Sequence, residues 1–238
     1  MKVLGITRPG PADVMTLMNA VCGAAAVLVV LSYAARPPAD LAESGVRAAT
    51  LLLLAGTIFD SLDGAFARGG RGTALGGMLD SLADALTFGF APAVLLAQLG
   101  FVTASGPGRV LVVLGFLAYV SGALLRLADF SSSRQDDPAF TGLPSPLAAA
   151  AVVSLAFLTT SPLVIGIGLA ALGLMMVSRL SYPKLRGPLV AAALAAWIGG
   201  ILGTLGAFDM RIFAAVILLL IGLTPVLPAL MPRERVHV

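Results

Sequence analysis

Four aspartates stand close together in an otherwise apolar region of the 238-residue chain. They are Asp60, Asp63, Asp80 and Asp84. A carboxylate at the centre of a membrane helix costs about 2.5–3.5 kcal/mol on insertion scales. Neighbouring carboxylates also repel one another unless a positive charge lies among them. The cluster therefore predicts a divalent-metal site and, with it, an enzyme.

The spacing of these aspartates predicts that they share one site. Asp60 and Asp63 are three residues apart at the end of one apolar run, and Asp80 and Asp84 are four apart at the start of the next. Each pair therefore lies on one face of a helix. The short Gly-rich segment 69–76 predicts that the two helices are antiparallel and lie side by side, with both pairs at the same depth.

The residue types around the aspartates indicate the chemistry. Carboxylate oxygens without a nearby His or Cys favour Mg²⁺ or Mn²⁺ over Zn²⁺, and Mg²⁺ usually completes its shell with phosphate oxygens. A phosphorylated substrate is expected, and Arg68 could neutralise its diphosphate. Gly64 and Ala67 leave the helix backbone open to a ligand. Asp84, one turn deeper, could accept a proton from an attacking hydroxyl.

The composition excludes an ordinary soluble domain, because 58% of the residues are hydrophobic, 11% are charged and the mean hydropathy is +1.00. A helix needs about 20 apolar residues to cross a bilayer. We predict an all-α, polytopic transmembrane bundle that forms one domain over residues 1–238. Its eight expected helices are 14–34, 46–67, 77–98, 109–128, 145–160, 162–178, 188–206 and 211–230. The fifth and sixth form either a helical hairpin or one broken helix, and a count of six or seven is the alternative.

The basic residues predict the orientation in the membrane. With eight spans, eleven of them lie on the side of the aspartates: Lys2, Arg8, Arg68, Arg71, Arg126, Arg134, Arg179, Lys184, Arg186, Arg233 and Arg235. The other four are Arg36, Arg47, Arg109 and Arg211. The positive-inside rule then predicts an integral protein of the cell membrane with both termini and the aspartates facing the cytoplasm.

Two further patterns concern partners and the membrane interface. Basic residues are not interleaved with aromatic residues in a cluster, so we expect no nucleic-acid partner. Trp197 and Tyr33, near the ends of apolar runs, are interpreted as anchors at the membrane interface.

The aspartate array resembles the signature of the CDP-alcohol phosphatidyltransferases, D-x2-D-G-x2-A-R-x8-G-x3-D-x3-D. Here it is formed by Asp60, Asp63, Gly64, Ala67, Arg68, Gly76, Asp80 and Asp84. One spacing differs, because seven residues rather than eight separate Arg68 from Gly76. Segments between residues 13 and 188 resemble the membrane-integrated phosphatidylserine synthases of bacteria and archaea, namely 16–19 with 22–23, 80–92, 122–128, 141–146 and 178–184.

The resemblance implies a six-helix core with additional helices, a homodimer and two bound Mg²⁺ or Mn²⁺ ions. It implies that Asp60, Asp63 and Asp80, with Asp84 as a further ligand, hold the ions against the diphosphate of a CDP-linked lipid. The residues expected to bind that lipid are Thr16, Asn19, Gly64, Ala67, Arg68 and Gly76. Asp84 would deprotonate the hydroxyl of L-serine, which attacks the lipid phosphorus of CDP-diacylglycerol and releases CMP. Arg126, Arg179 and Lys184 are candidates for holding the serine carboxylate.

Alternatives remain for the acceptor and the lipid. Asp129 stands where the phosphatidylserine synthases carry an arginine, which favours another alcohol or another lipid tail. An archaetidylserine synthase with an ether-linked donor, or a transferase to glycerol phosphate or inositol phosphate, would retain the mechanism. A cation-coupled transporter is the alternative from another class, but it predicts acidic residues spread over several helices.

Overall fold

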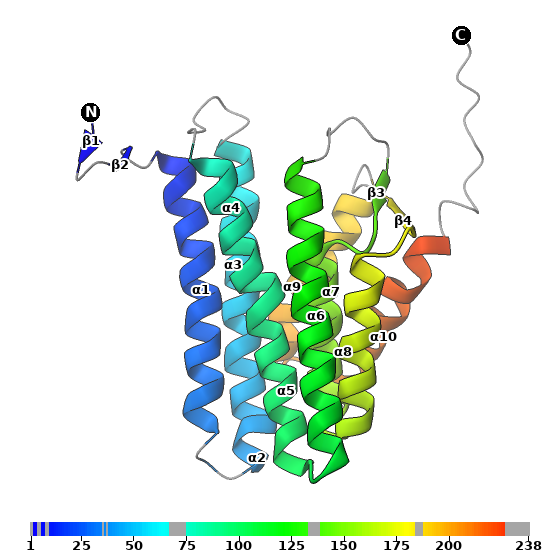
Figure 1. Cartoon of the computed structure of the whole chain (residues 1–238). Coiled ribbons are helices and arrows are strands. Elements are labelled where there is room, and N and C mark those ends of the chain that lie inside the picture. Colours follow the sequence, from blue (N-terminus) through cyan, green and yellow to red (C-terminus); the bar gives the residue numbers. More distant parts are fainter. Residues whose placement is uncertain are drawn as a thin grey trace.

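The computed structural model describes residues 2–3, 6–7, 10–34, 36, 38–66, 75–132, 139–183 and 188–226. Within these ranges the chain forms a bundle of apolar helices that run roughly along one common axis (Figure 1). The helices are α1 (Pro11–Tyr33), α2 (Pro38–Asp40), α3 (Val46–Phe66), α4 (Gly76–Asp84), α5 (Ala91–Thr103), α6 (Pro107–Ser132), α7 (Ser145–Leu158), α8 (Pro162–Met176), α9 (Pro188–Thr204) and α10 (Met210–Leu223). Short π-helical segments η1 (Leu41–Gly45) and η3 (Ala85–Phe90) join α2 to α3 and α4 to α5, and the short helix η4 (Thr224–Val226) follows α10.

The lengths of these helices are those of an integral membrane protein. Four continuous helices are long and apolar enough to cross a bilayer: Pro11–Tyr33, Leu41–Phe66, Gly76–Thr103 and Pro107–Phe130. Four further apolar helices, α7 to α10, contain 14 to 17 residues. At 1.5 Å per residue a 14-residue helix is about 21 Å long, less than the hydrocarbon core of about 30 Å. The prediction of an all-α, polytopic membrane bundle is confirmed.

Two small pairs of strands lie at one end of the bundle. Strand β1 (Lys2–Val3) pairs antiparallel with β2 (Ile6–Thr7), and β3 (Ala139–Thr141) pairs antiparallel with β4 (Ser181–Pro183). Strand β3 precedes α7 and β4 follows α8, so the chain leaves this end along α7 and returns along α8 (Figure 1). The fifth and sixth expected helices are therefore a helical hairpin and not one broken helix.

Glycines set the packing of α8 against α6. A Cβ atom added to Gly115 would collide with the carbonyl oxygen of Gly166, and one added to Gly122 would collide with that of Gly173. Small residues allow such close approach between membrane helices, where van der Waals packing rather than the hydrophobic effect drives association. This contact joins α6 to α8, and α6 also contacts α5 and η3.

Two polar side chains attach α9 to α3. Trp197 donates its indole N–H to the carbonyl oxygen of Leu54 across 3.2 Å. Near the opposite end of the bundle from the aspartates, Arg47 donates to the carbonyl oxygens of Gly203 at 3.3 Å and Thr204 at 2.8 Å. The expectation that Trp197 lies near a helix end is wrong, because the residue lies in the interior of α9. Tyr33 ends α1, and the Arg36 guanidinium carbon lies 4.5 Å from its ring centroid.

Candidate active site

Three of the four aspartates converge at one end of the bundle. Asp60 comes from the last turns of α3, and Asp80 and Asp84 come from α4. One carboxylate oxygen from each lies within 4.8 Å of the others, and all three residues are half-buried. Oxygen ligands lie about 2.0–2.6 Å from Mg²⁺ or Ca²⁺, so this spacing fits three ligands of one cation. The acidic triad could therefore bind a metal ion.

Helix α1 is the support on which the triad is assembled. It packs along α3 and also against α4, whereas contacts between α3 and α4 themselves are sparse. The two helices are antiparallel, as predicted, and their carboxylates meet, but their backbones do not pack closely against each other. Because α1 holds both of them, their carboxylates can meet without close contact between the backbones.

Asn19 connects α1 to both α4 and η3. This residue is fully buried, and its side-chain amide donates to Oδ1 of Asp84 across 3.2 Å. Its backbone oxygen accepts a hydrogen bond from the Thr87 hydroxyl at 2.9 Å. Asn19 thereby orients the Asp84 carboxylate and fixes the helix that carries it. Its own Oδ1 has no hydrogen-bond partner in the part of the chain that the structure describes.

Two glycines allow this close approach. A Cβ atom on Gly23 would lie 2.5 Å from Oγ1 and 2.8 Å from Cα of Thr87. A Cβ atom on Gly56 would lie 2.8 Å from Cγ2 of Thr87 and 3.0 Å from Oδ1 of Asn19. Since real Cβ atoms do not tolerate such contacts, α1, α3 and η3 can meet only where these side chains are absent.

The π-helical segment η3 has an identifiable cause. Pro92 has no N–H and its ring excludes the carbonyl of the residue four positions earlier, so the helix cannot form the usual bond to Phe88. The Phe88 oxygen instead accepts a hydrogen bond from the hydroxyl of Tyr119, a fully buried residue of α6, at 3.0 Å. Single π-helical turns are frequent at functional sites. Here the widened turn follows directly after Asp84.

Asp63 lies outside the triad but close to it. It is 6% exposed, and its Oδ2 has no hydrogen-bond partner among the described residues. The hydroxyl of Thr16 donates to the Ala12 carbonyl oxygen at 3.1 Å and lies beside the Asp63 carboxylate. A buried carboxylate oxygen without a partner is unfavourable unless a cation or a donor pairs with it. Four carboxylates, one of which has an oxygen without a hydrogen-bond partner, fit a bound divalent cation.

The remaining expected site residues fall into three groups. Thr16 is buried, and Gly64 and Gly76 are half-buried at the ends of α3 and α4 that carry the aspartates. Arg126 is buried near the end of α6, whereas Arg179 is exposed after α8. Ala67, Arg68 and Lys184 lie outside the described residues.

Three residues that support the site were not predicted from the sequence. They are Gly56, Thr87 and Tyr119. Gly56 precedes Asp60 by one helical turn and so lies on the same helix face. This spacing could have identified Gly56 from the sequence. Thr87 and Tyr119 act through contacts with distant helices, which helix periodicity does not report.

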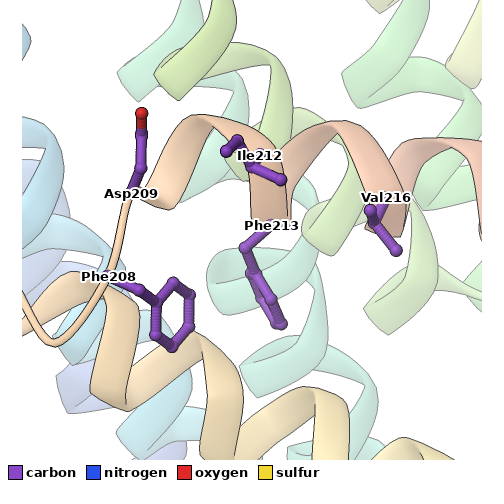
Figure 2. Close-up of a pocket in the computed structure, with 5 residues that line it drawn as sticks. All are labelled: Phe208, Asp209, Ile212, Phe213 and Val216. Atoms are coloured by element: carbon purple, nitrogen blue, oxygen red, sulfur yellow. The ribbon is translucent and has the colours of Figure 1, made fainter.

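A separate apolar pocket is lined by Phe208, Asp209, Ile212, Phe213 and Val216 (Figure 2). It lies at the start of α10, towards the end of the bundle away from the aspartates (Figure 1). A Cβ atom on Gly203 would lie 2.7 Å from the Phe208 ring, and one on Gly199 would lie 2.7 Å from that of Phe213. The glycines of α9 therefore let these rings pack on its backbone, and the pocket contributes nothing to the acidic site.

The architecture and the acidic site define a membrane-embedded enzyme of the CDP-alcohol phosphatidyltransferase class. Residues 11–180 match that family, and the chain belongs to it. The chain is 31% identical over 173 residues to the CDP-diacylglycerol–serine O-phosphatidyltransferase of Bacillus subtilis (strain 168), covering 72% of this chain and 89% of that protein. It is 31% identical over 180 residues to the archaetidylserine synthase of Methanothermobacter thermautotrophicus, covering 74% and 70%. A CDP-diacylglycerol–serine O-phosphatidyltransferase of Methanocaldococcus jannaschii is 32% identical over 173 residues, with 72% and 73% covered.

Proposed function

We propose that this enzyme transfers the phosphatidyl group of CDP-diacylglycerol to L-serine, forming phosphatidylserine and releasing CMP. The observation that carries the proposal is the convergence of Asp60, Asp80 and Asp84 within 4.8 Å at one end of a membrane bundle. The chain is similar over most of its length to CDP-diacylglycerol–serine O-phosphatidyltransferases, and this similarity supports serine as the acceptor.

Divalent cations, two Mg²⁺ or Mn²⁺ ions, are the proposed cofactors. Asp60, Asp63, Asp80 and Asp84 would hold them. When bound, such ions neutralise the diphosphate and stabilise the charge that develops on the leaving phosphate. The unpartnered, buried Oδ2 of Asp63 supports its inclusion, since it lacks a protein donor within the described residues.

Asp84 is the proposed general base. Its carboxylate takes the proton of the serine hydroxyl as the serine oxygen bonds to the phosphorus of the lipid phosphate. The bond between that phosphorus and the bridging oxygen of the diphosphate breaks, and CMP leaves with the electron pair. The hydrogen bond from Asn19 to Oδ1 supports this role, because it orients the Asp84 carboxylate.

The donor nucleotide is proposed to lie along the face of α3 and the start of α4. Gly64 and Ala67 would allow it to contact the helix backbone, Arg68 would pair with its phosphates, and Gly76 would leave space beside Asp80. Thr16 and Asn19 would border it from α1. For the serine carboxylate the candidates are Arg126, Arg179 and Lys184, since an arginine or lysine is needed to hold that charge.

The remaining partners and the topology are also proposals. The excess of basic residues on the side of the aspartates supports an active site that faces the cytoplasm from the cell membrane. The chain is proposed to act as one domain over residues 1–238 and to form a homodimer. A second candidate, transfer from an ether-linked CDP-lipid, is favoured by the similarity to an archaetidylserine synthase.

The test is CMP release by the purified protein in detergent. CDP-diacylglycerol or an ether-linked CDP-lipid is supplied with Mg²⁺ or Mn²⁺ and with L-serine, glycerol phosphate or inositol phosphate. We expect release that requires both metal and L-serine, with phosphatidylserine identified by mass spectrometry. Asp84→Asn should lower the rate about 10²–10⁴-fold, the usual contribution of a general base. The matched control is Asp40→Asn, which alters an exposed carboxylate outside the site. Release with glycerol phosphate but not with serine would contradict the proposal.

A further inference from the structure

A pair of opposite charges, Arg126 and Asp129, lies on α6 near the acidic site, and Asp129 has no role in the mechanism above. Arg126 is 8% exposed, and Asp129 follows it by three residues on an exposed position. The two side chains attract each other electrostatically. The guanidinium carbon of Arg126 also lies 5.5 Å from the ring centroid of Phe130. A buried arginine near a membrane surface is costly to desolvate, so its position calls for a functional explanation.

The helix face that carries Arg126 is the face that meets the segment after Asp84. Tyr119, Ala123 and Arg126 are spaced by four and three residues, so they share one face of α6. Tyr119 bonds the Phe88 carbonyl at 3.0 Å. A Cβ atom on Gly89 would lie 3.2 Å from that of Ala123. Arg126 therefore continues a face that is already in contact with η3.

The direction of the helices places the charged pair at the depth of the aspartates. Helix α6 rises towards the aspartate end, whereas α4 and η3 descend from it (Figure 1). From the Gly89–Ala123 contact, Arg126 is about 4.5 Å nearer to that end, at 1.5 Å per residue. Asp84 and then Asp80 lie in the same direction from Gly89, at the end of α4 that η3 continues and further along α4. Arg126 and Asp129 thus lie at about the same depth in the bundle as the acidic triad.

The other carboxylates at this end already have assignments within the described residues. Asp13 caps the start of α1, where its Oδ2 accepts the N–H of Gly10 at 2.7 Å. Asp60, Asp63, Asp80 and Asp84 form the acidic site. Asp129 is the remaining described carboxylate at this end, and it stands beside a buried cation.

A zwitterionic acceptor needs both signs of charge. In neutral solution L-serine carries a carboxylate and an ammonium group on the same carbon atom, a few ångströms apart. Leaving either one unpaired at a partly buried site is unfavourable. A guanidinium is suited to the carboxylate because it offers a planar fork of donors, and a carboxylate is suited to the ammonium group.

We propose that Asp129 is a specificity-determining residue that binds the ammonium group of serine, while Arg126 binds the carboxylate. This inference rests on the proposed serine transferase activity and deepens it. The Arg126–Asp129 pair then separates around the substrate, and each partner exchanges one ionic contact for another. The acidic residue at position 129 becomes part of serine recognition and no longer argues for a different alcohol.

The test uses acceptors that each lack one charge. The unaltered protein should prefer L-serine to 3-hydroxypropionate, which lacks the ammonium group, and to ethanolamine, which lacks the carboxylate. In Asp129→Asn, the KM for L-serine should rise about 10–100-fold, the loss expected for a hydrogen bond to a charged group. The KM for 3-hydroxypropionate and for CDP-diacylglycerol should stay unchanged. Asp129→Glu should restore most of the serine affinity, and Asp40→Asn is the control.

Two results would overturn the inference. If Asp129→Asn leaves the KM for L-serine unchanged, Asp129 does not contact the substrate. If it raises the KM for L-serine and 3-hydroxypropionate equally, Asp129 acts only by holding Arg126. In both cases the unaltered protein still turns over serine, so the proposed function stands. Absence of serine-dependent CMP release by the unaltered protein would overturn the proposed function and this inference together.

Discussion

The side-chain amide of Asn19 donates to Oδ1 of Asp84 across 3.2 Å, although 65 residues separate the two in the chain. The same residue accepts the Thr87 hydroxyl on its backbone oxygen at 2.9 Å. One residue of α1 therefore holds the proposed base through its side chain and η3 through its backbone oxygen.

Replacing Asn19 tests this relationship. Asn19→Ala should lower the rate of CMP release about 10–100-fold, because a hydrogen bond to a charged group contributes about 1.5–3 kcal/mol. Its helix should persist, since alanine is the best helix former. The control in the same helix is Ser32→Ala, which removes an exposed hydroxyl that donates to the Val29 carbonyl oxygen. Equal rates for Asn19→Ala and the unaltered protein would show that Asp84 needs no support from α1.

The acidic triad makes a prediction about metal. Asp80→Asn should lower activity at least about 100-fold and raise the Mg²⁺ or Mn²⁺ concentration needed for half-maximal CMP release, because it removes a ligand charge. Treatment with EDTA should abolish the activity of the unaltered protein, and added Mg²⁺ or Mn²⁺ should restore it. Undiminished turnover after complete chelation would contradict the assignment of the triad. Asp40→Asn should behave as the unaltered protein.

The tight contact at Gly56 predicts a suppressor. Gly56→Ala should destabilise the protein by about 1–3 kcal/mol, the usual cost of overpacking, because its Cβ would lie 2.8 Å from Cγ2 of Thr87. Thr87→Ser removes that methyl group but retains the hydroxyl that bonds Asn19, so the double variant should recover part of the loss. Thermal unfolding in detergent measures both effects. Gly222→Ala is the control, since nothing lies within 4 Å of its added Cβ. Additive losses in the double variant would rule out this contact as the cause.

The buried hydroxyl of Tyr119 predicts a second compensation. Tyr119→Phe should cost about 1–3 kcal/mol, because it leaves the Phe88 carbonyl without its donor. Pro92→Ala supplies a backbone N–H four residues after Phe88, which can replace that donor and close an ordinary α-helical turn. Tyr119→Phe should therefore be less harmful to thermal stability in the Pro92→Ala background than alone. The same loss in both backgrounds would show that the carbonyl is not the relevant partner.

Much of the architecture followed from the sequence because it depends on local chemistry. Apolar runs with few charges predict membrane helices wherever they occur, since the backbone must satisfy its own hydrogen bonds in lipid. The intervals of three and four residues between the aspartates placed each pair on one helix face without reference to any other part of the chain. The family resemblance of residues 60–84 needed no structure either, and the family match confirmed it.

The tertiary structure decided how those helices meet. Periodicity does not report that α1 holds α3 and α4 together, that Asp63 stays outside the triad, or that Trp197 bonds Leu54 on another helix. It also does not report that Tyr119 replaces the N–H that Pro92 lacks, because the donor and the proline lie on different helices. Such contacts depend on the shapes of surfaces that are far apart in the chain, and glycines such as Gly23 and Gly56 gain their meaning only from the Thr87 side chain packed against them. The sequence by itself determined which groups could do chemistry, and the packing of α1 against its neighbours decided which of them lie together.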